Sequence, residues 1–254
     1  MLSTGDDGIH ANAAITINNG DIDITKSYEG IEAPVVTIND GDIHAVSSDD
    51  GVNMGVDSGM PGPGQAGARL SLYSGSYYLY INGGYLFVNA LGDGIDSNGA
   101  IVMKGGVVIV DGPSSDMNSA LDHVAFNITT GYLVATGSSG MALPPGDLSA
   151  QYSVMLNFQT ANQAGTLISV RTSNGTELFT FKPAKRYQSI VFSLPSLSLG
   201  STYEIYIGGS HTGTIKDGLY SGGTYSPGTK YTSFTINSKL TRLGPSGGFF
   251  PLPP

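Results

Sequence analysis

The 254-residue chain contains no cysteine. Its fold therefore uses no disulfide, and the redox state of its compartment does not constrain it. No apolar run approaches the ~18 residues that a membrane-spanning helix needs, so we expect no membrane span. Basic residues are also few, with 11 Lys and Arg against 20 Asp and Glu and a net charge of −9. A phosphate backbone attracts a basic stripe, so this charge argues against nucleic acid and favours a divalent cation or a cation-bridged acidic polymer as partner.

The chain also lacks signs of helices and of a leader. Its 37 glycines favour turns and strands, and no stretch shows a convincing amphipathic helical pattern. The first five residues have neither the basic start nor the apolar stretch of a signal peptide. Because an acidic turn follows at once, we expect the chain to begin inside a repeat.

What the chain does have is a short repeat, in which an acidic residue, a glycine and an aliphatic residue precede an alternating apolar run. Its clearest copies are Asp7-Gly8-Ile9, Glu29-Gly30-Ile31, Asp50-Gly51-Val52 and Asp93-Gly94-Ile95. The one double-length step, from Asp50 to Asp93, contains a Gly/Pro-rich insertion. Each unit is typical of three short strands joined by turns, which is one coil of a parallel β-helix. The sequence predicts about six coils.

Stacked coils would place aliphatic residues in three interior columns that form one continuous core. These columns are predicted to be Ile15/Val36/Leu79/Ile101/Phe126, Ile22/Ile43/Leu86/Val108/Leu133 and Ile9/Ile31/Val52/Ile95/Leu121/Met141. The residues between them point outward, and in the later coils they become apolar at Phe87, Ile109 and Val134. Such a stripe is an aggregation hazard if exposed. We expect the C-terminal part of the chain or a second subunit to cover it, with an aromatic binding platform as the alternative.

Composition changes near Pro144, after which acidic turns stop and strand-like stretches are joined by Asn-Gly and Asp-Gly signals. The predicted organisation is a parallel β-helix over residues 1–144, a small β-sandwich-like module over 145–240 and a Gly/Pro-rich tail over 241–254.

The acidic turns carry the clearest chemistry. Successive coils lie about 4.8 Å apart, so stacked carboxylates repel unless a cation neutralises them. Calcium takes six to eight oxygen ligands, whereas no His/Cys spacing suggests zinc. The predicted calcium ligands are Asp6, Asp7, Glu29, Glu32, Asp49, Asp50, Asn53, Asp93, Asp96 and Asp122, with His10 in the same column as Glu32. The alternative is that each acid simply caps backbone amides at a tight turn.

These units resemble the carbohydrate-binding β-helix family of clostridia and related bacteria, which is similar to calcium-dependent family 9 pectate lyases. The resemblance is carried by segments such as Gly5–Ala11, Lys26–Glu32, Ser48–Asn53, Gly92–Gly99 and Gly218–Tyr225. It implies a right-handed parallel β-helix, bound calcium, an extracellular or cell-surface location, and binding of plant cell-wall polysaccharides such as pectin and cellulose.

Three functions remain open at this stage. Sugar rings stack on aromatic faces, and because tryptophan is absent we expect Tyr78, Tyr80 and Tyr85 to bind polysaccharide; Tyr73 and Tyr77 lie close by in the sequence. A calcium-dependent lyase would need a basic residue to take a proton, and the repeats offer few, namely Lys26, Arg69 and Lys104. We therefore prefer binding without catalysis. An unpaired first coil would also allow end-to-end assembly into an extracellular fibre.

Overall fold

The computed structural model describes residues 1–55 and 77–246, and every regular element in these ranges is a β-strand. The Gly/Pro-rich insertion with Arg69 and Tyr73, and the part of the expected tail beyond residue 246, lie outside the described residues. The strands form three sheets. Within the described ranges there is no helix long and apolar enough to cross a membrane.

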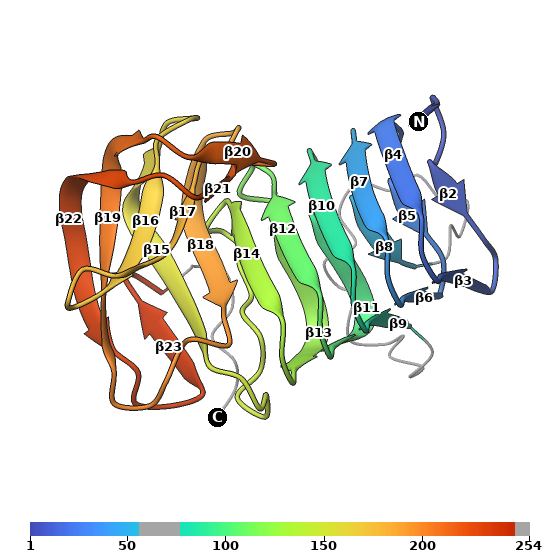
Figure 1. The fold of residues 1–254 in the computed structure, drawn as a ribbon. Coiled ribbons are helices and arrows are strands. Elements are labelled where there is room, and N and C mark those ends of the chain that lie inside the picture. Colours follow the sequence, from blue (N-terminus) through green and yellow to red (C-terminus); the bar gives the residue numbers. More distant parts are fainter. Residues whose placement is uncertain (56–76, 247–254) are drawn as a thin grey trace.

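The largest sheet has nine strands and runs through both halves of the chain. In spatial order its strands are β1 (Leu2–Ser3), β4 (Asp21–Lys26), β7 (Asp42–Ser47), β10 (Tyr85–Ala90), β12 (Val107–Asp111), β14 (Tyr132–Gly137), β18 (Tyr187–Ser193), β15 (Ser153–Asn162) and β23 (Leu240–Leu243). From β1 to β14 all neighbours are parallel, whereas β18 is antiparallel to both β14 and β15. Figure 1 shows the parallel strands side by side, with β18 pointing the opposite way.

The eight-stranded sheet collects the other strands of the repeats. Its strands are β2 (Ile9–His10), β5 (Ile31–Glu32), β8 (Val52–Met54), β11 (Ile95–Met103), β9 (Tyr78–Ile81), β6 (Val35–Ile38), β3 (Ala14–Ile17) and β13 (Leu121–Ile128), which pairs with β11. The rows β2-β5-β8 and β3-β6-β9 meet in β11, which pairs with β8 at its start and with β9 at its end. The sheet therefore turns back toward its own beginning and is nearly closed.

The six-stranded sheet belongs to the C-terminal half and is antiparallel. Its strands are β20 (Thr214–Lys216), β21 (Leu219–Ser221), β17 (Glu177–Phe181), β16 (Ile168–Thr172), β19 (Thr202–His211) and β22 (Tyr225–Thr235).

The nine-stranded sheet is the central layer because it has a core on each face. On one face, Ile43, Leu86 and Val108 pack with residues of the eight-stranded sheet such as Leu79 and Ile101. The core between these two sheets contains the predicted interior columns. The column from Ile22 to Leu133 lies on the nine-stranded sheet, and those from Ile15 to Phe126 and from Ile9 to Leu121 lie on the eight-stranded sheet, all paired in the predicted register, whereas Met141 lies outside the strands.

The other face holds the outward apolar stripe. Ile109 and Val134 are fully buried in a cluster with Phe179 and Ile205 of the six-stranded sheet, and Phe87 packs against it. The expectation that the C-terminal part of the chain covers this stripe is confirmed. The apolar outward residues on β10, β12 and β14 therefore form the surface against which the six-stranded sheet packs.

The predicted fold class, a right-handed parallel β-helix followed by a separate sandwich-like module, is wrong. The sheets are mixed, because antiparallel β18 and β15 follow β14 in the same sheet. Two strands of the expected module, and β23 at the start of the expected tail, therefore belong to the sheet of the repeats. The reason is that β14 is the last parallel strand and has an apolar outer face. Its free main-chain groups pair with β18, and its outer side chains pack against the six-stranded sheet. The domain boundaries at residues 144 and 240 stay predictions.

Candidate metal sites on the acidic turns

The acidic turns stack directly on one another where the long strands of the central sheet lead into β5, β8 and β11. The amides of Gly8, Gly30 and Gly51 donate to the carbonyl oxygens of Glu29, Asp50 and Asp93, at 2.9, 3.0 and 2.9 Å. A side chain at these glycines would meet the carbonyl oxygen of the next turn at less than contact distance. The glycine of the repeat is therefore required by the close approach of successive turns.

The carboxylates that precede these glycines make contacts along the same column. Oδ1 of Asp7 accepts from the amide of Glu29 at 3.3 Å, and Oδ1 of Asp50 accepts from the amide of Asp93 at 2.7 Å. Asp93 repeats the contact with the amide of Ser119. Amide capping, the alternative interpretation of the acidic turns, is thus present, and it acts between turns rather than within one.

A second column runs beside the first, on β2, β5, β8, β11 and β13. The described register pairs His10 with Glu32, Glu32 with Asn53, Asn53 with Asp96, and Asp96 with Asp122. The two columns together place carboxylates from neighbouring turns close enough to share an ion.

The first group of this kind is Asp50, Asp93 and Asp96, whose carboxylate oxygens lie within 4.8 Å of one another. Asp93 is only 6% exposed. Burial, followed by the charges of Asp96 and Asp93, raises the pKa of Asp50 to about 9. Asp50 therefore resists ionisation beside the other two carboxylates, and a bound dication would relieve the repulsion. The all-oxygen ligand set suits a hard cation.

Glu29 lies between the two groups of ligands and has a different partner. Nδ2 of Asn53 donates to both of its carboxylate oxygens at 2.9 Å. Burial raises the pKa of Glu29 to about 7, against the lowering effect of the Asn53 hydrogen bonds. Oδ1 of Asn53 is buried and has no hydrogen-bond partner in the described part of the chain. This oxygen is a further potential ligand beside Asp96.

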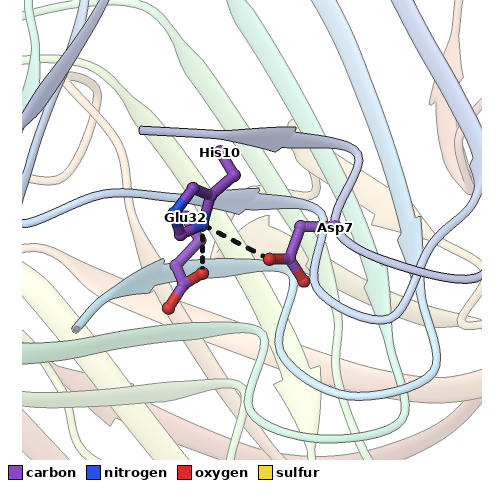
Figure 2. Close-up of side chains that lie close together, drawn as sticks. All are labelled: Asp7, His10 and Glu32. Carbon is purple, nitrogen blue, oxygen red and sulfur yellow. Dashed lines mark hydrogen bonds and ion pairs between the residues drawn. The ribbon is translucent and has the colours of Figure 1, made fainter. Parts of the chain in front are cut away.

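The second group is Asp7, His10 and Glu32, whose side chains converge from two neighbouring turns (Figure 2). Nδ1 of His10 is 2.6 Å from Oε2 of Glu32 and 3.4 Å from Oδ2 of Asp7. Burial is the largest cause that raises the pKa of Glu32, which is 3% exposed. Hydrogen bonds to Asn12 and Glu32 raise the pKa of His10. His10 was not among the predicted ligands, although its position in the second column was the signal that could have identified it.

The remaining predicted ligands lie outside these two groups. Asp6 is exposed, and its carbonyl oxygen accepts from the amide of Tyr28. Asp49 interacts with the Tyr28 hydroxyl, and this hydrogen bond is the main cause that raises the pKa of Tyr28 to about 12. Asp122 is 7% exposed and lies opposite Asp96 on β13.

The three candidate sugar-binding tyrosines do not form one surface. Tyr78 and Tyr80 are partly exposed on β9, with stacked rings whose centroids are 5.4 Å apart and whose planes differ by 11°. Tyr85 is on β10 in the central sheet, where its hydroxyl donates to Asp217 at 2.8 Å and Nζ of Lys216 lies 3.8 Å from its ring centroid. Only the pair on β9 therefore lies on the outer surface of the eight-stranded sheet.

One comparison with known proteins identifies a similarity. A family model described as a carbohydrate-binding domain-containing protein matches residues 2–51, a segment that includes the turns at Asp7, Glu29 and Asp50. No curated protein and no solved structure matches the chain. The match supports polysaccharide binding and agrees with the carbohydrate-binding part of the resemblance. The further similarity to pectate lyases is not confirmed.

Proposed function

We propose that this protein is an extracellular, non-catalytic polysaccharide-binding protein in which calcium holds the acidic turns together. The observation that carries the proposal is the match of residues 2–51 to a carbohydrate-binding family. Plant-type acidic polysaccharides such as pectin fit it best, because calcium can bridge a sugar carboxylate to an acidic protein surface. The net charge of −9 repels the same polymer when no cation is present.

Calcium is proposed to bind at Asp50, Asp93 and Asp96. Asp50 comes from one turn and Asp93 and Asp96 from the next, and the buried oxygen of Asn53 lies beside them in the second column. Carbonyl oxygens and water would complete the six to eight ligands that calcium takes. An ion at this point links β8 to β11 through their side chains.

The sugar itself is proposed to contact the outer face of the strands β3, β6, β9, β11 and β13. On this face Thr16, Thr37, Tyr80, Val102 and Asn127 pair in register, which gives a row of mostly small side chains beside the tyrosine pair. Because the rings of Tyr78 and Tyr80 stack on each other, each has one face left for a pyranose ring.

The test is retention of the full chain on insoluble polygalacturonate and, separately, on cellulose, with calcium or with chelator. We expect polygalacturonate to retain the protein only with calcium. A Tyr78→Ala, Tyr80→Ala double variant should bind several-fold more weakly, while the matched variant Tyr206→Ala, on β19 of the six-stranded sheet, should bind as wild type. Equal retention in chelator would exclude calcium bridging, and no retention on either polymer would contradict the function.

Self-assembly is a second candidate, and a row of asparagines favours it. Nδ2 of Asn82 donates to Oδ1 of Asn39, and Nδ2 of Asn39 donates to Oδ1 of Asn18, both at 2.8 Å. Within the described residues, the strands β1, β2 and β3 end their sheets and pair on one side only. A second copy stacked on this edge would extend the ladders, and Thr16→Lys on β3 should then reduce the assembly that light scattering detects. Monomers at all concentrations would contradict it.

A further inference from the structure

The two groups of potential ligands on the acidic turns differ in chemistry. Asp50, Asp93 and Asp96 offer oxygen atoms only, whereas Asp7 and Glu32 share their site with the imidazole of His10. Nδ1 of His10 faces the carboxylates of both Glu32 and Asp7 (Figure 2).

A residue outside this group fixes the orientation of the imidazole. Nε2 of His10 lies 3.1 Å from Oδ1 of Asn12. An amide oxygen only accepts, so Nε2 carries the hydrogen and the neutral ring has its lone pair on Nδ1. That nitrogen faces two carboxylates, so it needs a positive centre there, which is either a proton on Nδ1 itself or a metal ion bound by all three groups. Histidines that bind metals have this outer hydrogen bond, which holds the ring and its tautomer in place.

The site also combines a rigid ligand with an accessible one. Glu32 is 3% exposed and is held by the pairing of β5 with both β2 and β8. The side chain of His10 is 40% exposed. A buried carboxylate below an exposed imidazole gives an ion both a fixed ligand and an entry path.

We propose that Asp7, His10 and Glu32 bind one transition-metal dication of the zinc class, at a site separate from the calcium site. Zinc binds imidazole nitrogen and carboxylate oxygen at about 2.0–2.2 Å, so the ligand atoms of a tetrahedral site lie about 3.3 Å apart. The distance from His10 to Asp7, 3.4 Å, already fits, and the 2.6 Å contact to Glu32 has to open by only about 0.7 Å. Water takes the fourth position. Calcium, which needs six to eight oxygens, fits this set poorly.

This inference does not depend on the carbohydrate-binding function, and its test uses no sugar. The full chain is freed of metal, saturated with calcium and titrated with zinc chloride in a calorimeter. We expect one zinc ion per chain. His10→Gln and Glu32→Gln should each weaken binding at least about tenfold, and Asn12→Ala should weaken it less. The matched variant Asp50→Asn, in the oxygen-only group, should bind zinc as wild type does.

Cobalt provides a second measurement, because Co²⁺ in a four-coordinate site absorbs visible light far more strongly than the hydrated ion. The wild type should show this absorption and His10→Gln should lose it while keeping the wild-type circular dichroism spectrum. Two results would overturn the proposal. One is equal zinc affinity in wild type and His10→Gln, which would mean surface binding elsewhere, and the other is a wild type that binds no zinc at millimolar concentration.

Discussion

The parallel strands of the repeats and the antiparallel six-stranded sheet arrange charge in opposite ways. In the repeats, each residue pairs with the residue at the same position of the next repeat, so Asp21 pairs with Asp42 and Asp96 pairs with Asp122. In the six-stranded sheet, Arg171 pairs with Glu177 on one side and with Glu204 on the other. Parallel pairing of a repeat places like charges together, whereas antiparallel pairing brings unrelated positions together and permits neutral pairs.

The two regions also meet, and the contact neutralises part of the acidic surface. Nζ of Lys216, on β20, is 2.6 Å from Oδ2 of Asp42, and Asp217 bonds to Nε2 of His44 at 2.8 Å. Asp42, the one acid on β7, thus receives a basic partner from the C-terminal half, and His44 beside it receives an acidic one. On the turns, Asp50, Asp93 and Asp96 bring their carboxylate oxygens within 4.8 Å of one another, which is why we propose a metal ion there and not on the strand faces.

The largest effect is expected from a charge in the core of the repeats. Ile101 is fully buried between the two sheets, and Ile101→Asp would place an unpaired carboxylate there. We expect a loss of more than ~4 kcal/mol in the free energy of unfolding, enough to abolish folding, measured by denaturant titration. The control Ile101→Val should cost only about 0.5–1.5 kcal/mol. A wild-type melting temperature for the Asp variant would mean that the interior column is assigned wrongly.

A smaller loss is expected where successive turns approach each other. A methyl group at Gly51 would clash with Val88 and with the carbonyl oxygen of Gly94. Gly51→Ala should therefore cost about 1–3 kcal/mol by urea unfolding. Gly5 has no atom near its missing side chain, so Gly5→Ala is the matched control and should be close to neutral. Equal stability of the two variants would contradict the stacking of the turns.

Calcium removal should affect the repeats and spare the six-stranded sheet. A ligand at 100 times its dissociation constant stabilises a fold by about 2.7 kcal/mol, so chelation should lower the melting temperature. Asp93→Asn should shrink that difference. Hydrogen exchange should show faster exchange in β8 and β11 without calcium and no change in β16 and β19. An unchanged melting temperature with calcium and with chelator would contradict the calcium site and leave amide capping as the role of the acidic turns.

The pH dependence of the metal-free protein should follow the buried carboxyls. The pKa of Asp50 is about 9 in the folded protein against an ordinary 3.8, and that of Glu29 is about 7 against 4.5, in both cases mainly through burial. The folded state then holds protons that the unfolded chain releases, so stability falls as pH rises from about 4 to about 9. Melting temperatures across this range, compared with those of Asp50→Asn, measure the effect. A flat profile in both proteins would count against it.

The smallest effect is expected in the neutral pairs of the six-stranded sheet. Nζ of Lys230 is 2.5 Å from Oε1 of Glu204 on the protein surface. Because exposed ion pairs contribute little and are screened by salt, Lys230→Gln should change the melting temperature by an amount near the limit of detection. The change should be the same with calcium and with chelator. A calcium-dependent difference would show that the two regions are coupled.

The repeat and its register were predictable because an in-register parallel sheet copies the period of the sequence. Ile22, Ile43 and Leu86 could be aligned from spacing alone, and the structure pairs them so. The strand-like stretches after Pro144 include Glu177–Phe181 and Tyr187–Ser193, and both are strands in the structure. The partner of the second of these was not predictable, since nothing in the pattern of residues 187–193 distinguishes pairing with β14 from pairing within a separate module.

The same limit applies to the candidate sites. Spacing placed Asp50 and Asp93 in one column and Asp96 in the next, because those columns follow from the repeat. It did not show that His10 turns its Nδ1 toward Glu32, or that Asn12 holds the other ring nitrogen, because side-chain direction depends on contacts across neighbouring turns. Nor did it separate Tyr85 from Tyr78 and Tyr80, which only the assignment of their strands to different sheets decides.

The sequence by itself thus determined the acid-Gly repeat, the alternation of buried and exposed residues, and the columns that follow from a fixed period. All of these are local or periodic properties, and a period repeats in space whenever equal positions pair. Only the tertiary structure decided that the central sheet runs from the repeats into the C-terminal half, and which acids come together in groups. Those features depend on pairing between residues far apart in the chain, such as Val134 with Phe192, for which the sequence contains no period.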